Sequence, residues 1–236
     1  MADSGANSGT STATLRLTVG ALRIAHSITV PSRAVAASDV VPALQGLVNA
    51  VVETAETGKA ISCRRGCGAC CRQLVPISRT EGERLLQFVE SMPAGRRAML
   101  EARFADAEGK VVAAGLADRV DKSDRELSTA YFALGVPCPF LEEESCSIHA
   151  ERPLVCREYL VTSPAELCAG PKQDGVTPVA VPKLSMAARK LQDDADDWFP
   201  LALLLRWARA RPGQSTKRSG PEWIQRFLRQ IGRAQS

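Results

Sequence analysis

The sequence of 236 residues has no hydrophobic run long enough to cross a membrane. Its longest strongly apolar stretch, residues 198–208, is about half of the roughly 20 residues that a membrane-spanning helix needs. Residues 1–12 are small and polar, with neither the basic start nor the apolar middle of a secretory signal. These absences predict a cytoplasmic protein without a membrane span.

The sequence also lacks the motifs of several functional classes. No glycine-rich nucleotide loop follows a predicted strand, and there is no internal repeat and no heptad seam. The net charge of +4 is mild, although eight arginine or lysine residues lie within residues 206–236. A basic stretch of this kind is usually a solvated helix face, so nucleic-acid binding is not expected. It is the one hint of an unknown protein partner, and the oligomeric state stays open.

The apolar pattern predicts secondary structure of two kinds in the first 60 residues. Residues 14–30 alternate between apolar and polar around Gly20, which predicts a β-hairpin. The apolar period then changes to i, i+3, i+4, which predicts a helix that begins at Ser38 or Asp39 and ends at Gly58. This helix leads directly into the first group of cysteines.

Local start and stop signals predict further helices along the rest of the chain. Ser78 with Glu81, and Ser123 with Glu126, have the form of capping boxes, and Pro93 ends the first of these two helices. Two more helices are predicted. An apolar stripe at helical spacing indicates the first, and it consists of Leu100, Phe104, Ala107 and Val111. Ser219 opens the second, with Pro221 in its first turn.

The predicted fold is mainly α with a small N-terminal β-hairpin, an irregular helical domain organised around a cysteine–metal cluster. Because 45% of the residues are apolar, there is ample material for a core. We expect a disordered tail and a single domain with three parts: residues 1–12 form the tail, and the domain of residues 13–236 comprises the hairpin and lead-in helix (13–60), the cysteine-cluster core (61–171) and the C-terminal helices (183–236). Residues 169–182 and 211–220 read as loops.

Cysteine is the residue type that carries the chemistry in this sequence. Four of the eight cysteines lie within ten residues, in the stretch CRRGCGACCR, and the others are widely spaced. In a reducing cytosol structural disulfides are rare, so such a cluster indicates metal binding or redox chemistry. The candidate metal ligands are Cys63, Cys67, Cys70, Cys71, Cys138, Cys146, Cys156 and Cys168.

Thiolates suit both a structural zinc ion and a 4Fe-4S cluster, each of which usually takes four. Eight thiols would supply two such sites, or one site and spare groups. Cys67 and Cys70 form a CxxC unit in which Gly68 allows a tight turn. Because successive side chains diverge, we expect Cys70 and the adjacent Cys71 to serve different centres, or one of them to be no ligand.

The second group of cysteines has no further CxxC unit, which excludes a zinc ribbon and suits a site built from loops. Five arginines close to cysteines would hydrogen-bond sulfur and offset the charge of an anionic metal–thiolate unit. They are Arg64, Arg65, Arg72, Arg152 and Arg157.

Several simpler interpretations of these residues stay open. One alternative is that Cys138, Cys156 and Cys168 are ordinary buried residues that bind no metal. Another is that the two cysteines of the CxxC unit form a redox pair, although no βαβ pattern surrounds them. His149 lies three residues after Cys146 and is more typical of a helix start than of a ligand, and His26 falls in the strand pattern.

Several ordered segments together resemble one known family. They are CRRGCGACCR followed by LVPIS, then CPFL from Cys138, then CSIHAERPLVCREY from Cys146 to Tyr159. They resemble the zinc- or iron-chelating cysteine-cluster family named for its CxxCxxCC motif, here with three residues between the first two cysteines. The resemblance implies that all eight cysteines form the metal site. The cysteine segments are also distantly similar to flagellin lysine N-methylase, which implies an iron–sulfur cluster and methyl transfer.

The sequence therefore predicts a cytoplasmic metal-binding protein whose eight cysteines coordinate zinc or an iron–sulfur cluster. Two alternatives are an iron–sulfur enzyme of the protein-lysine methyl-transfer type and a metal chaperone or redox sensor. The sequence identifies no catalytic residue and no residue that binds an organic cofactor, and thiolate ligands do not distinguish zinc from iron.

Overall fold

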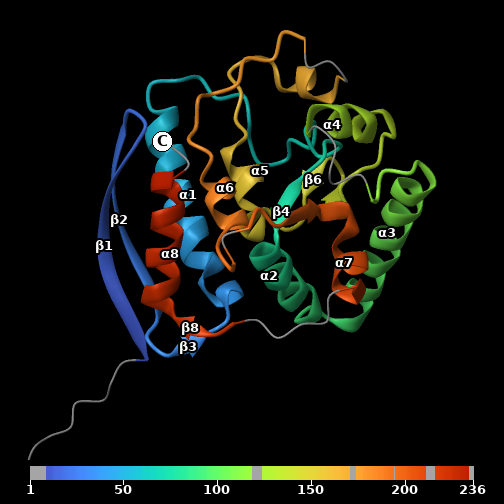
Figure 1. Cartoon of the computed structure of the whole chain (residues 1–236). Helices are drawn as coiled ribbons and strands as arrows, with labels where there is room; N and C mark the ends of the chain where they lie inside the picture. Colours follow the sequence, from blue (N-terminus) through green and yellow to red (C-terminus); the bar gives the residue numbers. More distant parts are fainter. Residues whose placement is uncertain (1–8, 119–123, 171–173, 194, 211–215, 234–236) are drawn as a thin grey trace, which may run out of the picture.

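The computed structural model describes residues 9–118, 124–170, 174–193, 195–210 and 216–233 of the chain. This part is mainly helical, with one long β-hairpin and several strands of two or three residues, as Figure 1 shows. The predicted fold class is therefore confirmed. None of the helices within the described ranges is both long and apolar enough to span a membrane.

The N-terminal hairpin consists of β1 (Thr10–Val19) and β2 (Leu22–Pro31), which pair in antiparallel register with Val19 opposite Leu22. Gly20 opens the two-residue turn at φ 59°, a left-handed conformation that glycine adopts without steric cost. Residues 10–12, which we assigned to the tail, belong to β1 because β2 continues to Pro31 and offers them backbone partners. Residues 1–8 lie outside the described part.

The helix after the hairpin is α1 (Val41–Glu56), and a short 3-10 turn, η1 (Ala37–Val40), precedes it. The predicted N-cap is wrong: Val40 occupies the cap of α1, and the Asp39 carboxylate accepts the Ala36 N–H at 3.0 Å, which caps the 3-10 turn. Gly58, at φ 74°, lies just beyond the end of the helix as predicted. The apolar stripe of α1 is buried against β2.

The C-terminal helix α8 (Gly220–Arg233) packs beside the hairpin and α6 (Leu184–Arg189). It begins as predicted, because Ser219 and Glu222 exchange hydrogen bonds as a capping box. Trp223 and Phe227 on its inner face are fully buried, and the Trp223 indole N–H donates to the Val35 carbonyl at 3.0 Å. That carbonyl belongs to β3 (Ala34–Val35), which pairs with β8 (Arg218–Ser219).

The opposite end of the molecule in Figure 1 consists of α2 (Arg79–Glu90), α3 (Ala94–Ala113) and α7 (Leu204–Ala210), with α4 (Asp124–Ala133) above them. The α2 capping box forms as predicted, and α3 buries Leu100, Phe104, Ala107 and Val111 as predicted. Ser123, the predicted start of α4, lies outside the described residues. The loops predicted at 169–182 and 211–220 contain no helix in their described parts apart from their terminal residues Ala169 and Gly220.

Short elements join these two ends. They are β4 (Pro76–Ser78) paired with β7 (Trp198–Pro200), β5 (Leu141–Glu142) paired with β6 (Ser145–Cys146), the 3-10 turns η2 (His149–Glu151), η3 (Ala165–Ala169) and η4 (Leu201–Leu203), and α5 (Leu154–Glu158). Two buried carboxylates hold α5 in place: Glu81 accepts the Leu154 N–H at 2.8 Å, and Glu158 accepts the Ser185 N–H at 2.7 Å. These bonds fix the position of Cys156, which lies in the middle of α5.

Candidate metal centre

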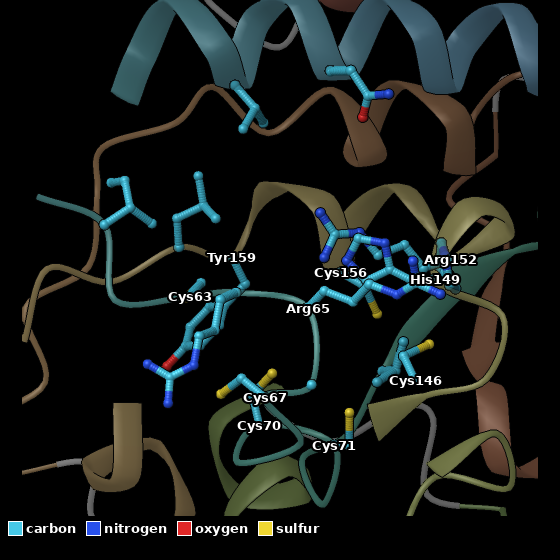
Figure 2. Close-up of a pocket in the computed structure, with 18 of the residues that line it drawn as sticks. Cys63, Arg65, Cys67, Cys70, Cys71, Cys146, His149, Arg152, Cys156 and Tyr159 are labelled. Carbon is cyan, nitrogen blue, oxygen red and sulfur yellow. The ribbon is translucent and has the colours of Figure 1, made fainter. Parts of the chain in front are cut away.

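The cysteines gather around one cavity of about 750 Å³ that lies between α1, α5 and the loop that follows α1. Seven of the eight line it: Cys63, Cys67, Cys70, Cys71, Cys138, Cys146 and Cys156. The eighth, Cys168 of η3, lies beside it, with its sulfur 3.9 Å from the hydroxyl oxygen of Tyr159, a residue of the cavity wall. Figure 2 shows six of these thiols and Tyr159 around the cavity. The fold therefore brings together all eight predicted site residues.

The first four cysteines lie on a loop built from successive tight turns. The Cys67 N–H donates to the Arg64 carbonyl at 3.1 Å, and the Cys71 N–H donates to the Gly68 carbonyl at 2.9 Å. Gly66 has φ 90°, a conformation that an L-residue rarely adopts. A Cβ at Gly68 would lie 2.7 Å from the Glu144 carbonyl oxygen, so this position needs glycine because the β5–β6 hairpin approaches closely.

Cys138 and Cys146 reach the same cavity from the other side. The Cys138 N–H donates to the Cys71 carbonyl at 2.7 Å, which joins this segment to the cysteine loop. Cys146 lies on β6, after a turn in which Glu143 and Glu144 both have positive φ, at 47° and 55°. Residues other than glycine rarely hold two consecutive left-handed conformations, so the surrounding contacts must enforce this turn.

The described cysteines fall into two neighbourhoods when their mutual electrostatic contacts are compared. The charges of Cys67 and Cys168 raise the pKa of the Cys63 thiol, whereas the charges of Cys138 and Cys146 raise the pKa of the Cys156 thiol. Cys70 influences members of both groups, and its side chain is hydrogen-bonded to that of Cys71. The adjacent pair is thus at the junction of the two neighbourhoods.

The cavity makes most of its thiols hard to ionise. Burial raises the pKa of Cys63, Cys146, Cys156 and Cys168, and it raises the pKa of Cys138 to about 12. For Cys70, the hydrogen bond with Cys71 is the first cause of a raised pKa, and burial is the second. These raised pKa values favour neutral thiols, so any metal that binds them must displace protons.

Basic side chains line one wall of the cavity. Figure 2 shows Arg65, His149 and Arg152 near Cys156. Within the described ranges, the Nε atom of Arg152 is buried and has no hydrogen-bond partner. The Arg152 charge lowers the pKa of Cys146 and of Cys156, which partly offsets their burial. The Nε–H group of Arg152 is therefore a buried donor without a partner in the described part of the chain, on a side chain whose charge acts on two of the thiols.

Two of the five predicted arginine donors serve other partners. Arg72 forms a two-pronged ion pair with Glu144. Arg157 donates from Nη1 to the Asn49 side-chain oxygen at 2.9 Å and from Nε to the Arg152 carbonyl at 2.9 Å. The prediction that these two would contact sulfur is wrong, because carboxylate and carbonyl oxygens lie nearer to them. Arg64, Arg65 and Arg152 line the cavity.

The two histidines lie in the kinds of element that the sequence predicted for them. His26 lies on β2, and His149 begins η2 as predicted. Burial, and after it the charge of Arg152, lowers the pKa of His149.

The sequence analysis gave no role to Tyr159, Gln73 or Glu144. The Tyr159 hydroxyl donates toward the Cys168 sulfur, and the Gln73 side-chain amide donates to the Cys168 carbonyl at 3.2 Å. The one available signal was the place of Tyr159 within the motif CREY.

The side chains of the described residues do not form a preassembled metal-binding group. Among them, no three His, Cys, Asp or Glu side chains are close enough together to hold an ion. What the fold provides is a single chamber with a high local concentration of thiols.

The fold and the chamber define a helical cysteine-cluster domain. Residues 62–175 match the model of the family CxxCxxCC, described as a "Putative zinc- or iron-chelating domain", and this segment contains all eight cysteines. Over that segment the chain is similar to this family. No curated protein and no solved structure is detectably similar to the chain.

Proposed function

We propose that this protein is a cytoplasmic metal-binding protein whose eight cysteines bind zinc or an iron–sulfur cluster. The observation that supports this best is the gathering of eight thiols around one cavity from four separate segments. Chance clustering of eight free cysteines is a poor alternative, because their positions in the sequence span about a hundred residues. Thiolate is the ligand that both structural zinc and iron–sulfur clusters use.

The chemistry of the surrounding residues also fits such a group. A metal held by four thiolates is anionic, and the buried Nε of Arg152 is a donor without a partner beside these thiols. An N–H group that is buried and unsatisfied costs free energy, and a metal-bound sulfur would supply the missing acceptor. The remaining cavity-lining arginines, Arg64 and Arg65, would offset the rest of the charge.

The place of the cysteines in the core indicates a structural role for the metal. Cys63 packs against the apolar cluster formed by the hairpin, α1 and α8, whereas Cys138 and Cys146 pack against the cluster around α2 and α3. Metal bound by these cysteines would therefore tie the loop that carries Cys63, Cys67, Cys70 and Cys71 to both halves of the molecule. Structural zinc contributes on the order of 10 kcal/mol to folding, so removal of the metal would weaken the whole domain.

The test is metal analysis of the intact chain purified without oxygen, followed by chelation. We expect stoichiometric zinc, or iron together with acid-labile sulfide, and a loss of helical circular dichroism when a chelator removes the metal. A chain that carries neither metal after reconstitution contradicts metal binding. A metal-free chain with full helicity and unchanged unfolding contradicts the structural role.

The size of the cavity favours a second candidate, an iron–sulfur enzyme that acts on a bound co-substrate. Its volume of about 750 Å³ is within the range of small-molecule sites, and α1 contributes Asn49 and Glu53 to its lining. This candidate requires iron, so a colourless protein with stoichiometric zinc and no iron would eliminate it.

A further inference from the structure

We propose that the eight thiols form two separate four-thiolate metal centres that meet at the Cys70–Cys71 dipeptide. The first comprises Cys63, Cys67, Cys70 and Cys168, and the second comprises Cys71, Cys138, Cys146 and Cys156. This partition rests on the proposed function, since it assigns the ligands of the metal that the cysteines are proposed to bind.

The mutual contacts of the thiols divide in this way. The charges of Cys67 and Cys70 both raise the pKa of Cys63 and of Cys168, so these four thiols lie within electrostatic range of one another. The thiols that influence Cys156 are Cys138, Cys146 and Cys70. The six cysteines outside the dipeptide therefore separate into two sets of three, with Cys70 in reach of both.

The dipeptide is suited to serve both sets because its two side chains are hydrogen-bonded to each other at the junction of the two sets. In Figure 2 the sulfur atoms of Cys67 and Cys70 lie together near Tyr159, while that of Cys71 lies toward Cys146. The backbone supports the same assignment, because the Cys71 carbonyl accepts the Cys138 N–H at 2.7 Å. Cys70 is therefore assigned to the first centre together with Cys67, the other cysteine of the CxxC unit. Cys71 is assigned to the second centre.

Each set also has its own polar neighbour and its own attachment to the core. The Tyr159 hydroxyl lies 3.9 Å from the sulfur of Cys168 in the first set, whereas the charge of Arg152 acts on Cys146 and Cys156 of the second set and on Cys70 at the junction. Cys63 packs against the hairpin-side apolar cluster, and Cys138 packs against the cluster around α2 and α3. Each metal centre would therefore attach the cysteine loop to a different apolar cluster.

The experiment measures zinc stoichiometry by native mass spectrometry after the full chain is reconstituted with zinc alone under reducing conditions. We expect about two zinc ions in the wild type, about one in Cys67→Ser, about one in Cys146→Ser and none in the double variant, as four-thiolate sites require. Met99→Ser, which replaces an exposed sulfur-containing side chain on α3, is the matched control and should keep both ions.

Alkylation of free thiols followed by peptide mapping supplies a second readout if a variant is poorly folded. In zinc-loaded Cys67→Ser, Cys63 and Cys168 should become labelled while Cys138, Cys146 and Cys156 stay protected, and Cys146→Ser should give the reverse pattern. A wild type with a single zinc, or a single variant that exposes all the remaining thiols, overturns the partition but leaves metal binding intact. A wild type that binds no metal at all overturns both.

Discussion

Arg72 and Glu144 form a bidentate ion pair, a clamp that links the cysteine loop to the β5–β6 hairpin. Nη1 and Nη2 of Arg72 donate to the two carboxylate oxygens of Glu144 at 2.9 and 2.6 Å. Arg72 directly follows Cys71, and Glu144 lies two residues before Cys146, so the pair fixes the separation of two proposed ligands. Glu144 itself has a left-handed backbone conformation, with φ at 55°.

Removal of this clamp should affect metal retention more than folding. Because the pair is largely exposed, its contribution to global stability is small. We expect Glu144→Gln to release zinc to a competing chelator several-fold faster than the wild type, with thermal unfolding nearly unchanged. Glu143→Gln, in the same turn, is the control. Equal release rates for the two variants would show that the clamp does not position the thiols.

Gly68 should not tolerate a side chain. An added Cβ would lie 2.7 Å from the Glu144 carbonyl oxygen, so Gly68→Ala must push the hairpin away from the cysteine loop. We expect a loss of about 1–3 kcal/mol in the free energy of unfolding, measured by urea denaturation. Gly109→Ala is the control, because Gly109 lies in α3 with open space around it and alanine there should stabilise by roughly 0.5–1 kcal/mol. A neutral Gly68→Ala would mean that the hairpin is not held at this distance.

Arg152 should have opposite effects in the metal-free and metal-loaded states. Its buried Nε has no partner in the described part of the chain, so Arg152→Met should leave the metal-free protein as stable as the wild type, or more stable. The same change should lower zinc affinity by about tenfold, since an outer donor to the ligands is lost. Chelator competition and unfolding of both states measure the two effects. Arg16→Met, at an exposed position of β1 outside the cavity lining, should change neither, and a destabilised metal-free Arg152→Met would contradict this account.

Glu81 should make the stability of the metal-free protein depend on pH. Burial raises the pKa of this carboxyl group, although hydrogen bonds from the Leu154 N–H and from Ser78 oppose the shift. The folded state therefore favours the protonated form, and the contribution of Glu81 to stability decreases as pH rises from its ordinary pKa through its raised one. The difference in unfolding free energy between wild type and Glu81→Gln should accordingly fall from pH 4 toward pH 8. A difference that increases with pH would mean that the pKa is lowered instead.

Local features of the fold were predictable because their causes lie within a few residues. The Ser78–Glu81 capping box and the four buried positions of α3 follow from side chains one helical turn apart. The start of α1 was not predictable in this way, since Asp39 caps a 3-10 turn whose existence depends on packing beneath the hairpin. Prediction was therefore better for element type than for element boundaries.

The candidate site was predictable in its membership but not in its arrangement. Spacing and composition identified the cysteines, whereas the partner of Arg72 lies 72 residues away and has no local signal. Proximity in sequence suggested that Arg157 would contact sulfur, but α1 brings the Asn49 side chain to it. On the arrangement, the sequence offered only the expectation that the adjacent Cys70 and Cys71 serve different centres, and this stays a prediction.

The long separation between Cys63 and Cys168 has a consequence for the newly made chain. Contacts between segments roughly a hundred residues apart form late, because loop closure must precede them. During synthesis the four thiols of CRRGCGACCR leave the ribosome well before Cys156 and Cys168 exist. For that interval the nascent chain exposes a dense group of thiols without its full ligand set, which makes it most vulnerable to oxidation or to capture of the wrong metal before the helices have packed.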